Sequence, residues 1–454
     1  MQSNGHAAEP GLNADLTPPS PTVPDHMRPS NRRWLLALLT TGTALNMLDR
    51  KIINILAEPI KHELSLSDAQ LGALTGLAFA LLYCTAALPI ARLADRSDRI
   101  RVFGASILTW SFFTAAGGAA TNFIQLFLLR IGVGIGEAGC APPAQSLIVD
   151  HFPPKRRSSA LAVFMSGQSI GSAAGLVLGG LLGGWLGWRW ALVLAGAPGL
   201  LVGAVLLGTL TDPRRHEALG ARPPPQPLWT VVGTLSRRPS FMLASLGFAT
   251  VSIVTYTTTA FAGSFYLRVH AAELAQLAQQ LGVSPLGVVG LGLGLFGSLG
   301  GAAGALTGGL LGDRLAARDV RALAFIPAAG MLLATIGFVA MFTVKSAGVS
   351  LLLSGAATFC LSLFSGPGSL ILQRVAGPHA RATGLAVTTF IASGLGLGIA
   401  PLATGILSDV LAPSLGAGEG LRYAILAGLV AGPLGGLFFA AAGRTLERDI
   451  AAAE

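Results

Sequence analysis

The feature that most constrains this chain is a series of long apolar segments, joined by short links that carry most of its charge. The segments reach the length of about 20 residues that an α-helix needs to cross the hydrocarbon core of a bilayer. Only 11% of the 454 residues are charged, against roughly 25% in an ordinary soluble domain. Because a soluble fold would lack surface charge and three Cys cannot staple a secreted scaffold, the sequence predicts a polytopic membrane protein.

We predict an all-α protein with twelve transmembrane helices, six on each side of a Pro-rich middle segment. Lipid cannot satisfy open backbone groups, so a span is a helix or part of a closed barrel. The long, unbroken apolar runs lack the alternation of barrel strands. The predicted spans are 34–57, 69–92, 102–120, 123–149, 157–183, 187–210, 238–267, 287–312, 321–343, 347–375, 380–409 and 421–443.

The same pattern divides the chain into five parts. Residues 1–31 are rich in Pro and poor in apolar runs, so we predict a disordered tail. An N-terminal helix bundle is predicted at 32–210 and a C-terminal bundle at 238–443. A charged, Pro-rich linker at 211–237 joins them, and 444–454 form a second tail.

Basic residues cluster at alternate links between the predicted spans. With a cytoplasmic N-terminus, 22 of the 30 Lys and Arg residues fall on the cytoplasmic side, and little beyond Lys61, Arg268, Lys345 and Arg422 falls on the other. This bias is typical of multi-pass membrane proteins, and it favours an even number of spans with both termini in the cytoplasm. It also accounts for the net charge of +9, so we expect no nucleic-acid partner.

A short motif recurs in the two halves. The sequence ARLADR at 91–96 follows the second span, and GLLGDR at 309–314 follows the eighth. A repeat at about half the chain length indicates duplication of a six-helix unit. Its Asp can cap a helix end and its Arg can hold the loop at the anionic leaflet, although an ordinary basic loop is the alternative. The residues in question are Asp95, Arg96, Asp313 and Arg314.

This pair resembles the G-x-L-a-D-R signature that the major facilitator superfamily carries in both halves. The first copy departs from the signature at Ala91, where Gly is usual. The resemblance implies two six-helix bundles around a central cavity, which rock to expose it to one side of the membrane at a time. It also implies that the motif residues take part in this conformational change.

Several charged residues lie within predicted spans: Asp49, Arg50 and Lys51 in the first, Arg130 and Glu137 in the fourth. Each would cost about 2.5–3.5 kcal/mol near the bilayer centre, so they should face an aqueous cavity or pair. Arg130 and Glu137 share one helix face, and their depth allows an Arg50–Glu137 or an Asp49–Arg130 pair. Protonating the acid would remove most of the attraction, which can couple a proton to a conformational change. A static ion pair that locks two helices is the alternative.

The sequences around these charges resemble the spinster-type branch of the superfamily. The matching runs are LNMLDR at 45–50, RIGVGIGEA at 130–138 and DHFPPKRR at 150–157. The resemblance implies a proton-linked exporter of sphingolipid or lysolipid type. It assigns proton coupling to Asp49 and Glu137, and substrate or charge-pair contacts to Arg50, Arg130 and Asn46.

Glycines repeat every four residues along the fifth predicted span, at Gly167, Gly171, Gly175, Gly179 and Gly183. Such a smooth stripe allows close helix packing. The stripe loosely resembles the antiporter motif of the superfamily but lacks its Pro. Close packing without antiport, and a sliding or rocking interface between the halves, both remain open.

Other motifs do not point to chemistry. Two G-x-G-x-x-G matches, at 134–139 and 292–297, follow no predicted strand, and no Walker A pattern occurs. The seven His fall in predicted tails or loops, and the three Cys are isolated. We therefore expect no enzyme activity, no cofactor and no metal site.

Our hypothesis from the sequence is a proton-linked secondary transporter of an amphipathic, lipid-like substrate, with the head group against the charged first half and the tail against the second. A polyspecific drug or organic-anion exporter of the same superfamily is the first alternative, followed by a lipid enzyme or scramblase and by a receptor or scaffold. The partners we expect are the substrate, protons and membrane lipids, with a monomer as the functional unit. The Ala-, Gly- and Arg-rich composition and the lack of an N-x-S/T sequon favour a bacterial inner membrane.

Overall fold

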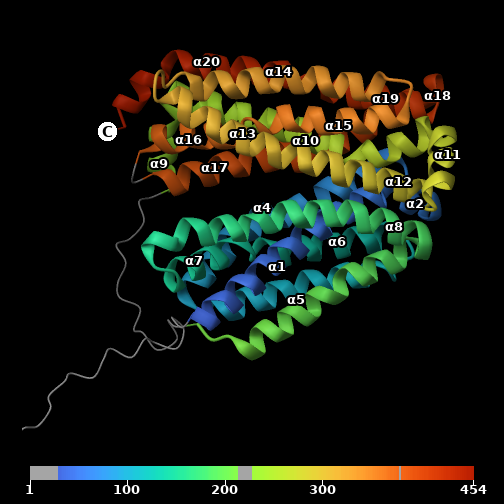
Figure 1. Cartoon of the computed structure of the whole chain (residues 1–454), viewed down its shortest axis with the longest axis horizontal. Helices are drawn as coiled ribbons and strands as arrows, with labels where there is room; N and C mark the ends of the chain where they lie inside the picture. Colours follow the sequence, from blue (N-terminus) through green and yellow to red (C-terminus); the bar gives the residue numbers. More distant parts are fainter. Residues whose placement is uncertain (1–28, 213–227, 378–379, 454) are drawn as a thin grey trace, which may run out of the picture.

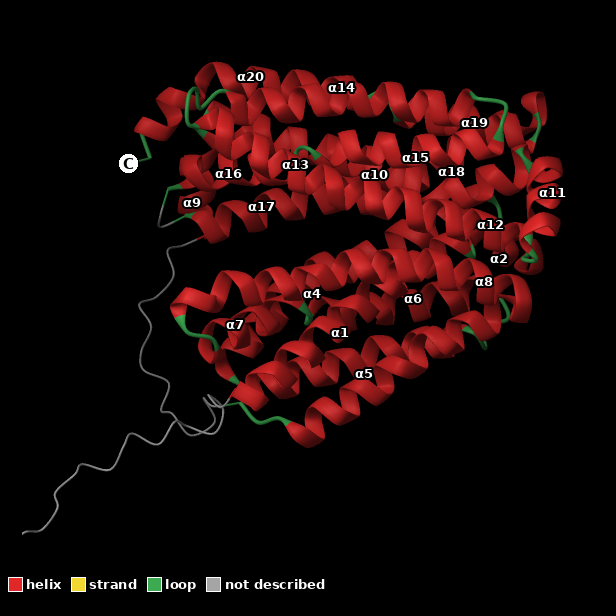
Figure 2. Cartoon of the chain, viewed as in Figure 1, coloured by secondary structure: helices red, strands yellow, loops and turns green. Residues whose placement is uncertain are grey.

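The computed structural model describes residues 29–212, 228–377 and 380–453, and every regular element in these ranges is a helix (Figure 2). The first half contains α1 (Pro29–Ile55), α2 (Ala57–Leu64), α3 (Asp68–Gly72), η2 (Ala73–Leu77), α4 (Ala78–Arg96), α5 (Arg99–Gly117), α6 (Phe123–Ala138), α7 (Ala141–His151) and α8 (Pro154–Thr209), where η marks a π-helical turn. The predicted all-α fold class is confirmed.

The second half begins with α9 (Leu228–Ser236), α10 (Pro239–Val269) and α11 (Ala271–Leu281). It continues with α12 (Pro285–Gly292), η4 (Leu293–Gly297), α13 (Ser298–Ala316), α14 (Ala322–Thr343), α15 (Ala347–Ser362) and α16 (Ser365–Ala376). It ends with α17 (Arg381–Ser393), η5 (Gly394–Ile399), α18 (Ala400–Leu415), α19 (Ala417–Gly428) and α20 (Ala431–Ala451).

Nine helical stretches within the described ranges are long and apolar enough to cross a membrane. One of them, α8, has 56 residues, which is about 84 Å of helix at 1.5 Å per residue. It turns at Gly187, where φ is 81°, a conformation that Gly adopts without a Cβ clash. We therefore count α8 as the fifth and sixth predicted spans. With α1 and α3–α4 as the first two, the structure agrees with twelve spans.

The helices form two bundles that lie side by side, α1–α8 in one and α10–α20 in the other (Figure 1). The bundles meet at the end that carries α2 and α11, which we call the closed end. Their ribbons diverge toward the opposite end, where α1 begins and α20 ends. At the closed end one apolar cluster continues across both bundles, from Ile55 and Leu56 to Phe261 and Phe265.

Glycines bring the two backbones into contact at this end. A Cβ on Gly72 of α3 would lie 2.2 Å from the carbonyl oxygen of Pro401 in α18, and one on Gly180 of α8 would lie 2.7 Å from that of Leu286 in α12. Farther along the same interface, η2 faces η5. π-helical turns of this kind often mark functional positions in helices, and here they lie in two of the helices that join the bundles.

The predicted boundaries of the tails, linker and bundles differ in detail from those of the structure. Most of the predicted tail at 1–31 and of the linker at 211–237 lies outside the described residues, and α9 occupies the last part of the linker. Helix α20 continues through Ala451, beyond the predicted bundle end at 443. Buried Asp449 explains the extension, because it accepts hydrogen bonds from the backbone N and Oγ of Ser240 at 2.9 and 2.7 Å.

Candidate functional site

Four of the five charged residues that the sequence places inside these spans, all except Lys51, meet between α1 and α6. Arg50 Nε donates to Glu137 Oε2 at 2.5 Å, and Arg130 Nη1 lies 3.6 Å from Asp49 Oδ2. Asp49 and Arg50 are consecutive, whereas Arg130 and Glu137 lie two turns apart on one face of α6. Both ion pairs that the sequence offered as alternatives are therefore present together.

Two aromatic rings of α4 hold the guanidinium of Arg50. Its Cζ lies 4.6 Å from the ring centroid of Phe79 and 4.5 Å from that of Tyr83. Arg130 Cζ lies 5.8 Å from the Phe79 ring. A cation over an aromatic face is attracted by the ring quadrupole, more strongly where water is excluded. Helix α4 is thus a third wall of the charged cluster, and sequence reasoning missed it.

The carboxylates lie deeper than the Arg50 side chain. Asp49 and Glu137 are each 2% exposed, whereas the side chain of Arg50 is 19% exposed. Thr114 Oγ1 of α5 donates to Asp49 Oδ1 at 2.7 Å. Within the described residues, Glu137 Oε1 accepts no hydrogen bond, and Nδ2 of buried Asn46 donates none. The second oxygen of Glu137 is therefore an unfilled polar position in the cluster, which is costly for a buried carboxylate.

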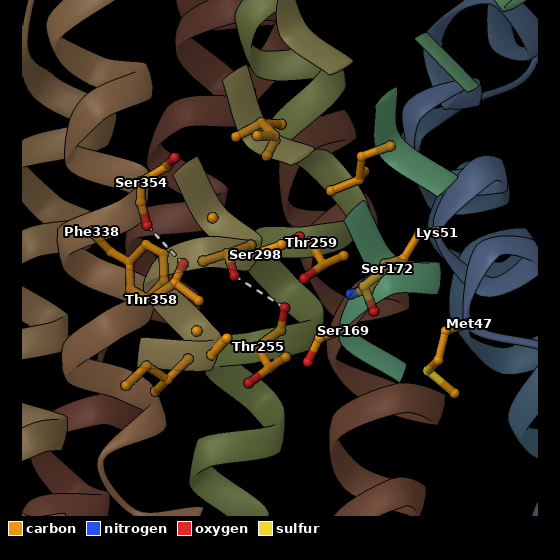
Figure 3. A pocket seen from close by; sticks show the side chains of 18 of the residues that line it. Met47, Lys51, Ser169, Ser172, Thr255, Thr259, Ser298, Phe338, Ser354 and Thr358 are labelled. Carbon is orange, nitrogen blue, oxygen red and sulfur yellow. Dashed lines mark hydrogen bonds between the residues drawn. The ribbon is translucent and has the colours of Figure 1, made fainter. Parts of the chain in front are cut away.

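Two adjoining cavities lie between the bundles beside this cluster. The smaller, of about 100 Å³, is lined by Arg50 and Arg130 among others. The larger, of about 330 Å³, lies between α1 and α8 of the first bundle and α10, η4, α13, α14 and α15 of the second (Figure 3). Met47, Lys51 and Thr255 line both cavities. The larger one falls in the size range of small-molecule sites, about 300–1,000 Å³.

A second charged cluster, which the sequence analysis did not predict, joins the bundles at the closed end. Arg268 of α10 donates two hydrogen bonds to Glu58 of α2, both of 2.7 Å, and two to Asp68 of α3, both of 2.8 Å. Asp409 of α18 accepts hydrogen bonds from the backbone N of Asp68 and Ala69 at 2.9 and 2.8 Å. We call Glu58, Asp68, Arg268 and Asp409 the closed-end cluster.

The repeated motif lies at the opposite end of the bundles from this cluster. The side chain of Asp95 lies outside the described part of the structure, and Arg96 is exposed at the end of α4. Asp313 and Arg314 are exposed near the end of α13. The capping role predicted for Asp313 is wrong, because this residue lies inside a helix rather than at the start of the next one. A role of the four residues in conformational change stays a prediction.

After the first copy of the motif, the neighbouring Asp98 supplies the cap, because its Oδ1 accepts from the backbone N of Arg101 at 3.0 Å at the start of α5. After the second copy, Asp319 accepts from the backbone N of Arg321 at 2.8 Å in the turn before α14. Arg99, the first residue of α5, is buried. It donates to both carboxylate oxygens of Asp212, at 2.6 and 2.8 Å, and to Asp150 at 2.6 Å.

The glycine stripe of α8 packs against α1. A Cβ on Gly171 would lie 2.0 Å from the carbonyl oxygen of Ala44, so the two backbones are in contact. Most of the stripe therefore packs within the first bundle, but its last member, Gly183, meets Leu286 of α12 in the second bundle as well as Leu56. Gly180, beside the stripe, also meets the second bundle, at Gly290 of α12. The stripe residues that meet α1 are Gly167, Gly171, Gly175 and Gly179.

Taken together, these features define a multi-pass α-helical membrane protein whose two bundles enclose cavities at their interface, which is the architecture of a secondary transporter. The sequence profile of the Major Facilitator Superfamily matches residues 39–401. The chain belongs to this superfamily.

Similar proteins lie in the spinster branch and beyond it. An MFS-type efflux pump of Mycolicibacterium smegmatis is 35% identical over 403 residues, which cover 87% of this chain and 89% of the pump. Human protein spinster homolog 1 is 32% identical over 268 residues, which cover 55% of this chain and 50% of that protein. The crystal structure of a bacterial homologue of the human lysosomal transporter Spinster, inward-facing and unoccupied, matches with a TM-score of 0.81 at 30% identity, covering 92% of this chain and 98% of that one. The predicted relation to the spinster type is confirmed.

Proposed function

We propose that the protein is a proton-linked secondary transporter that moves an amphipathic, lipid-like substrate of lysolipid or sphingolipid type by alternating access. The observation that carries this proposal is the buried Arg50–Glu137 ion pair, 2.5 Å long, beside a cavity between the bundles. The relation of the protein to the spinster type supports the proposed substrate class.

The ion pair gives a way to link a proton to substrate binding. At 4 Å and an effective dielectric constant near 20, two unit charges attract by about 4 kcal/mol before desolvation. A proton on Glu137 removes most of this attraction. Arg50, which also lines the smaller cavity, is then released to contact a substrate there. One proton thus changes the charge that the cavity presents.

The walls of the larger cavity suit a molecule with one polar and one apolar end. The first bundle contributes the charge of Lys51, and the second bundle contributes apolar side chains that include Leu293, Phe338 and Met341. Hydroxyl groups from both bundles line the space between them. An amphiphile can place its head group against the first bundle and its chain against the second.

Transport into liposomes tests the proposal. We expect the purified protein to move a fluorescent lysophosphatidylcholine across the bilayer, faster under an imposed pH gradient than without one, as measured by back-extraction with albumin. Protein-free liposomes are the control. No movement of this or any other single-chain amphiphile by folded protein contradicts the proposal and favours a receptor or scaffold.

A polyspecific drug or organic-anion exporter is a second candidate function. It is favoured by the relative from M. smegmatis, whose name is that of an efflux pump and which matches 87% of this chain. Competition separates the two functions. Inhibition of lysolipid transport by other lysolipids, without inhibition by cationic dyes, supports the first, and equal inhibition by both supports the second.

We also propose an inner-membrane location with both termini in the cytoplasm, on the basis of the positive charge at the end opposite the closed end. In a cysteine-free background, Gln279→Cys in α11 should react with an impermeant maleimide added to spheroplasts. Ser236→Cys in α9 should react only after the spheroplasts are lysed. Both positions are exposed, and the reverse pattern would contradict this orientation.

A further inference from the structure

The larger cavity has one charged side chain among the described residues that line it. This side chain is Lys51, and none of the described lining residues is Asp or Glu. The smaller cavity, which shares Lys51, is lined by Arg50 and Arg130, and again by no acid within the described part of the chain. The described lining of these two cavities is therefore positively charged.

The charge of Lys51 is not matched by an ion pair in the described part of the structure. Arg50 is paired with Glu137 and Arg130 with Asp49, but Lys51 forms no ion pair within the described residues. A cation withdrawn from bulk water without a counter-ion is unfavourable. A bound anion would supply the missing charge.

Hydroxyl groups beside Lys51 are free to donate to such an anion. Thr258, like several other hydroxyl residues of the cavity, already donates to its own helix. Ser169 and Ser172 of α8 and Thr259 of α10 line the same cavity and donate no hydrogen bond within the described ranges. Figure 3 shows Lys51 reaching from α1 toward the side of α8 that carries Ser172.

We propose that Lys51, with the hydroxyls of Ser169, Ser172 and Thr259, binds an anionic head group, carboxylate or phosphate, of the transported amphiphile and selects against cationic ones. The inference rests on the proposed function for its meaning in transport, but the binding itself needs no gradient. Hydrogen bonds that an ammonium donates to a carboxylate or phosphate are charge-assisted and roughly twice as strong as those between neutral groups. Lys51 is thus a residue that sets head-group specificity.

Equilibrium binding to the full chain in nanodiscs tests this site. Radiolabelled dodecyl phosphate is the probe, with dodecanoate and dodecyltrimethylammonium as competitors of equal chain length, and empty nanodiscs correct for partitioning. We expect dodecanoate to compete at least tenfold better than dodecyltrimethylammonium. Stronger competition by dodecanoate than by unlabelled dodecyl phosphate would assign the site to carboxylates, and the reverse to phosphates. Equal competition by the cation would overturn the proposal.

Substitutions locate the selectivity at Lys51. Lys51→Met should weaken dodecyl phosphate binding at least tenfold, while Lys51→Arg should stay within threefold of the unmodified chain. The exposed Lys345 gives a matched control, because Lys345→Met removes the same charge outside the cavity and should have no effect. Should Lys51→Met fail to fold, the paired change Ser169→Ala and Ser172→Ala serves, with an expected loss of about threefold to tenfold in affinity.

The results separate this inference from the proposed function. Unchanged dodecyl phosphate affinity in folded Lys51→Met, or in the double Ser variant where it replaces Lys51→Met, overturns the inference, even if the protein transports lysolipid. Charge-selective, Lys51-dependent binding without transport in liposomes upholds the inference and overturns the proposed function.

Discussion

Arg268 and Asp68 belong to different bundles, and their side chains form two parallel hydrogen bonds of 2.8 Å. The two side chains are 9% and 2% exposed. Paired bonds between a guanidinium and a carboxylate are both strong and specific in geometry. Any motion that separates the bundles at the closed end must break these hydrogen bonds. The pair therefore contributes to the free-energy cost of opening that end.

We predict that Arg268→Ala favours separation of the bundles at the closed end. Removing one partner of a buried pair typically costs about 3–5 kcal/mol, but Lys61, 2.5 Å from Asp68, keeps that carboxylate partly paired. We expect at least a tenfold shift of population, equal to about 1.4 kcal/mol. Distances between spin labels at Thr121→Cys and Gln279→Cys, measured by electron resonance, should show a longer component.

Arg189 provides the control for this experiment. It lies at the same end and pairs with Glu63 at 2.8 Å, but both residues belong to the first bundle. Arg189→Ala should therefore leave the distance distribution unchanged. A distribution that is also unchanged in Arg268→Ala would mean that the closed-end cluster does not hold the bundles together.

We predict that Glu137→Gln uncouples substrate movement from protons. The amide keeps the size of the side chain but carries no charge that a proton could cancel, so Arg50 is no longer controlled by protonation. In proteoliposomes containing a pH-sensitive dye, proton flux driven by substrate should fall at least tenfold, while downhill substrate exchange stays within a few-fold.

The companion variant Asp49→Asn tells which acid carries the proton. Proton flux retained in Glu137→Gln but lost in Asp49→Asn would assign proton coupling to the Asp49–Arg130 pair. Flux retained in both would remove the two carboxylates from the mechanism. Glu63→Gln, outside the charged cluster, should behave as the unmodified chain.

The sequence predicted the charged cluster between α1 and α6, because a charge within an apolar span must pair with an opposite charge or face water. Glu137 and Arg130 share a face of one helix, and their charges are unfavourable in lipid. Pairing with Asp49 and Arg50 was therefore the expected arrangement. The spans themselves followed from length and hydropathy. These predictions depend on distances along one or two helices, which periodicity fixes.

The closed-end cluster could not be predicted in this way. Arg268 and Asp68 are 200 residues apart, and their contact depends on how the end of α10 is placed against the start of α3. The sequence did contain a weak signal for this cluster. Glu58 and Asp68 lie next to the ends of predicted spans, on the side of the membrane where few other charges occur. Nothing in periodicity, however, says which of the remote basic residues meets them. The Phe79 contact with Arg50 was hidden for a similar reason, because a Phe in an apolar span has no distinguishing pattern.

We predict that Arg99→Ala destabilises the first bundle strongly. Arg99 and Asp212 have side chains that are 1% and 0% exposed, and the change removes charge-assisted hydrogen bonds between them, each worth about 1.5–3 kcal/mol. The apparent melting temperature in detergent should fall by several degrees. Arg101→Ala is the control, since its side chain is 65% exposed and its removal should change stability by less than about 0.5 kcal/mol. Equal effects of the two changes would contradict the structural role of Arg99.

Finally, we predict that Gly171→Ala separates α8 from α1 and lowers stability. The new Cβ would lie 2.0 Å from the carbonyl oxygen of Ala44, so the helices must move apart along a seam whose packing depends on small residues. Gly208→Ala is a matched control in the same helix, because no described atom lies within 4 Å of the position its Cβ would take. There the change should be neutral or stabilising by up to about 1 kcal/mol through helix propensity. Thermal unfolding of both variants in detergent measures the difference, and a Gly171→Ala protein as stable as Gly208→Ala would show that the seam tolerates a methyl group.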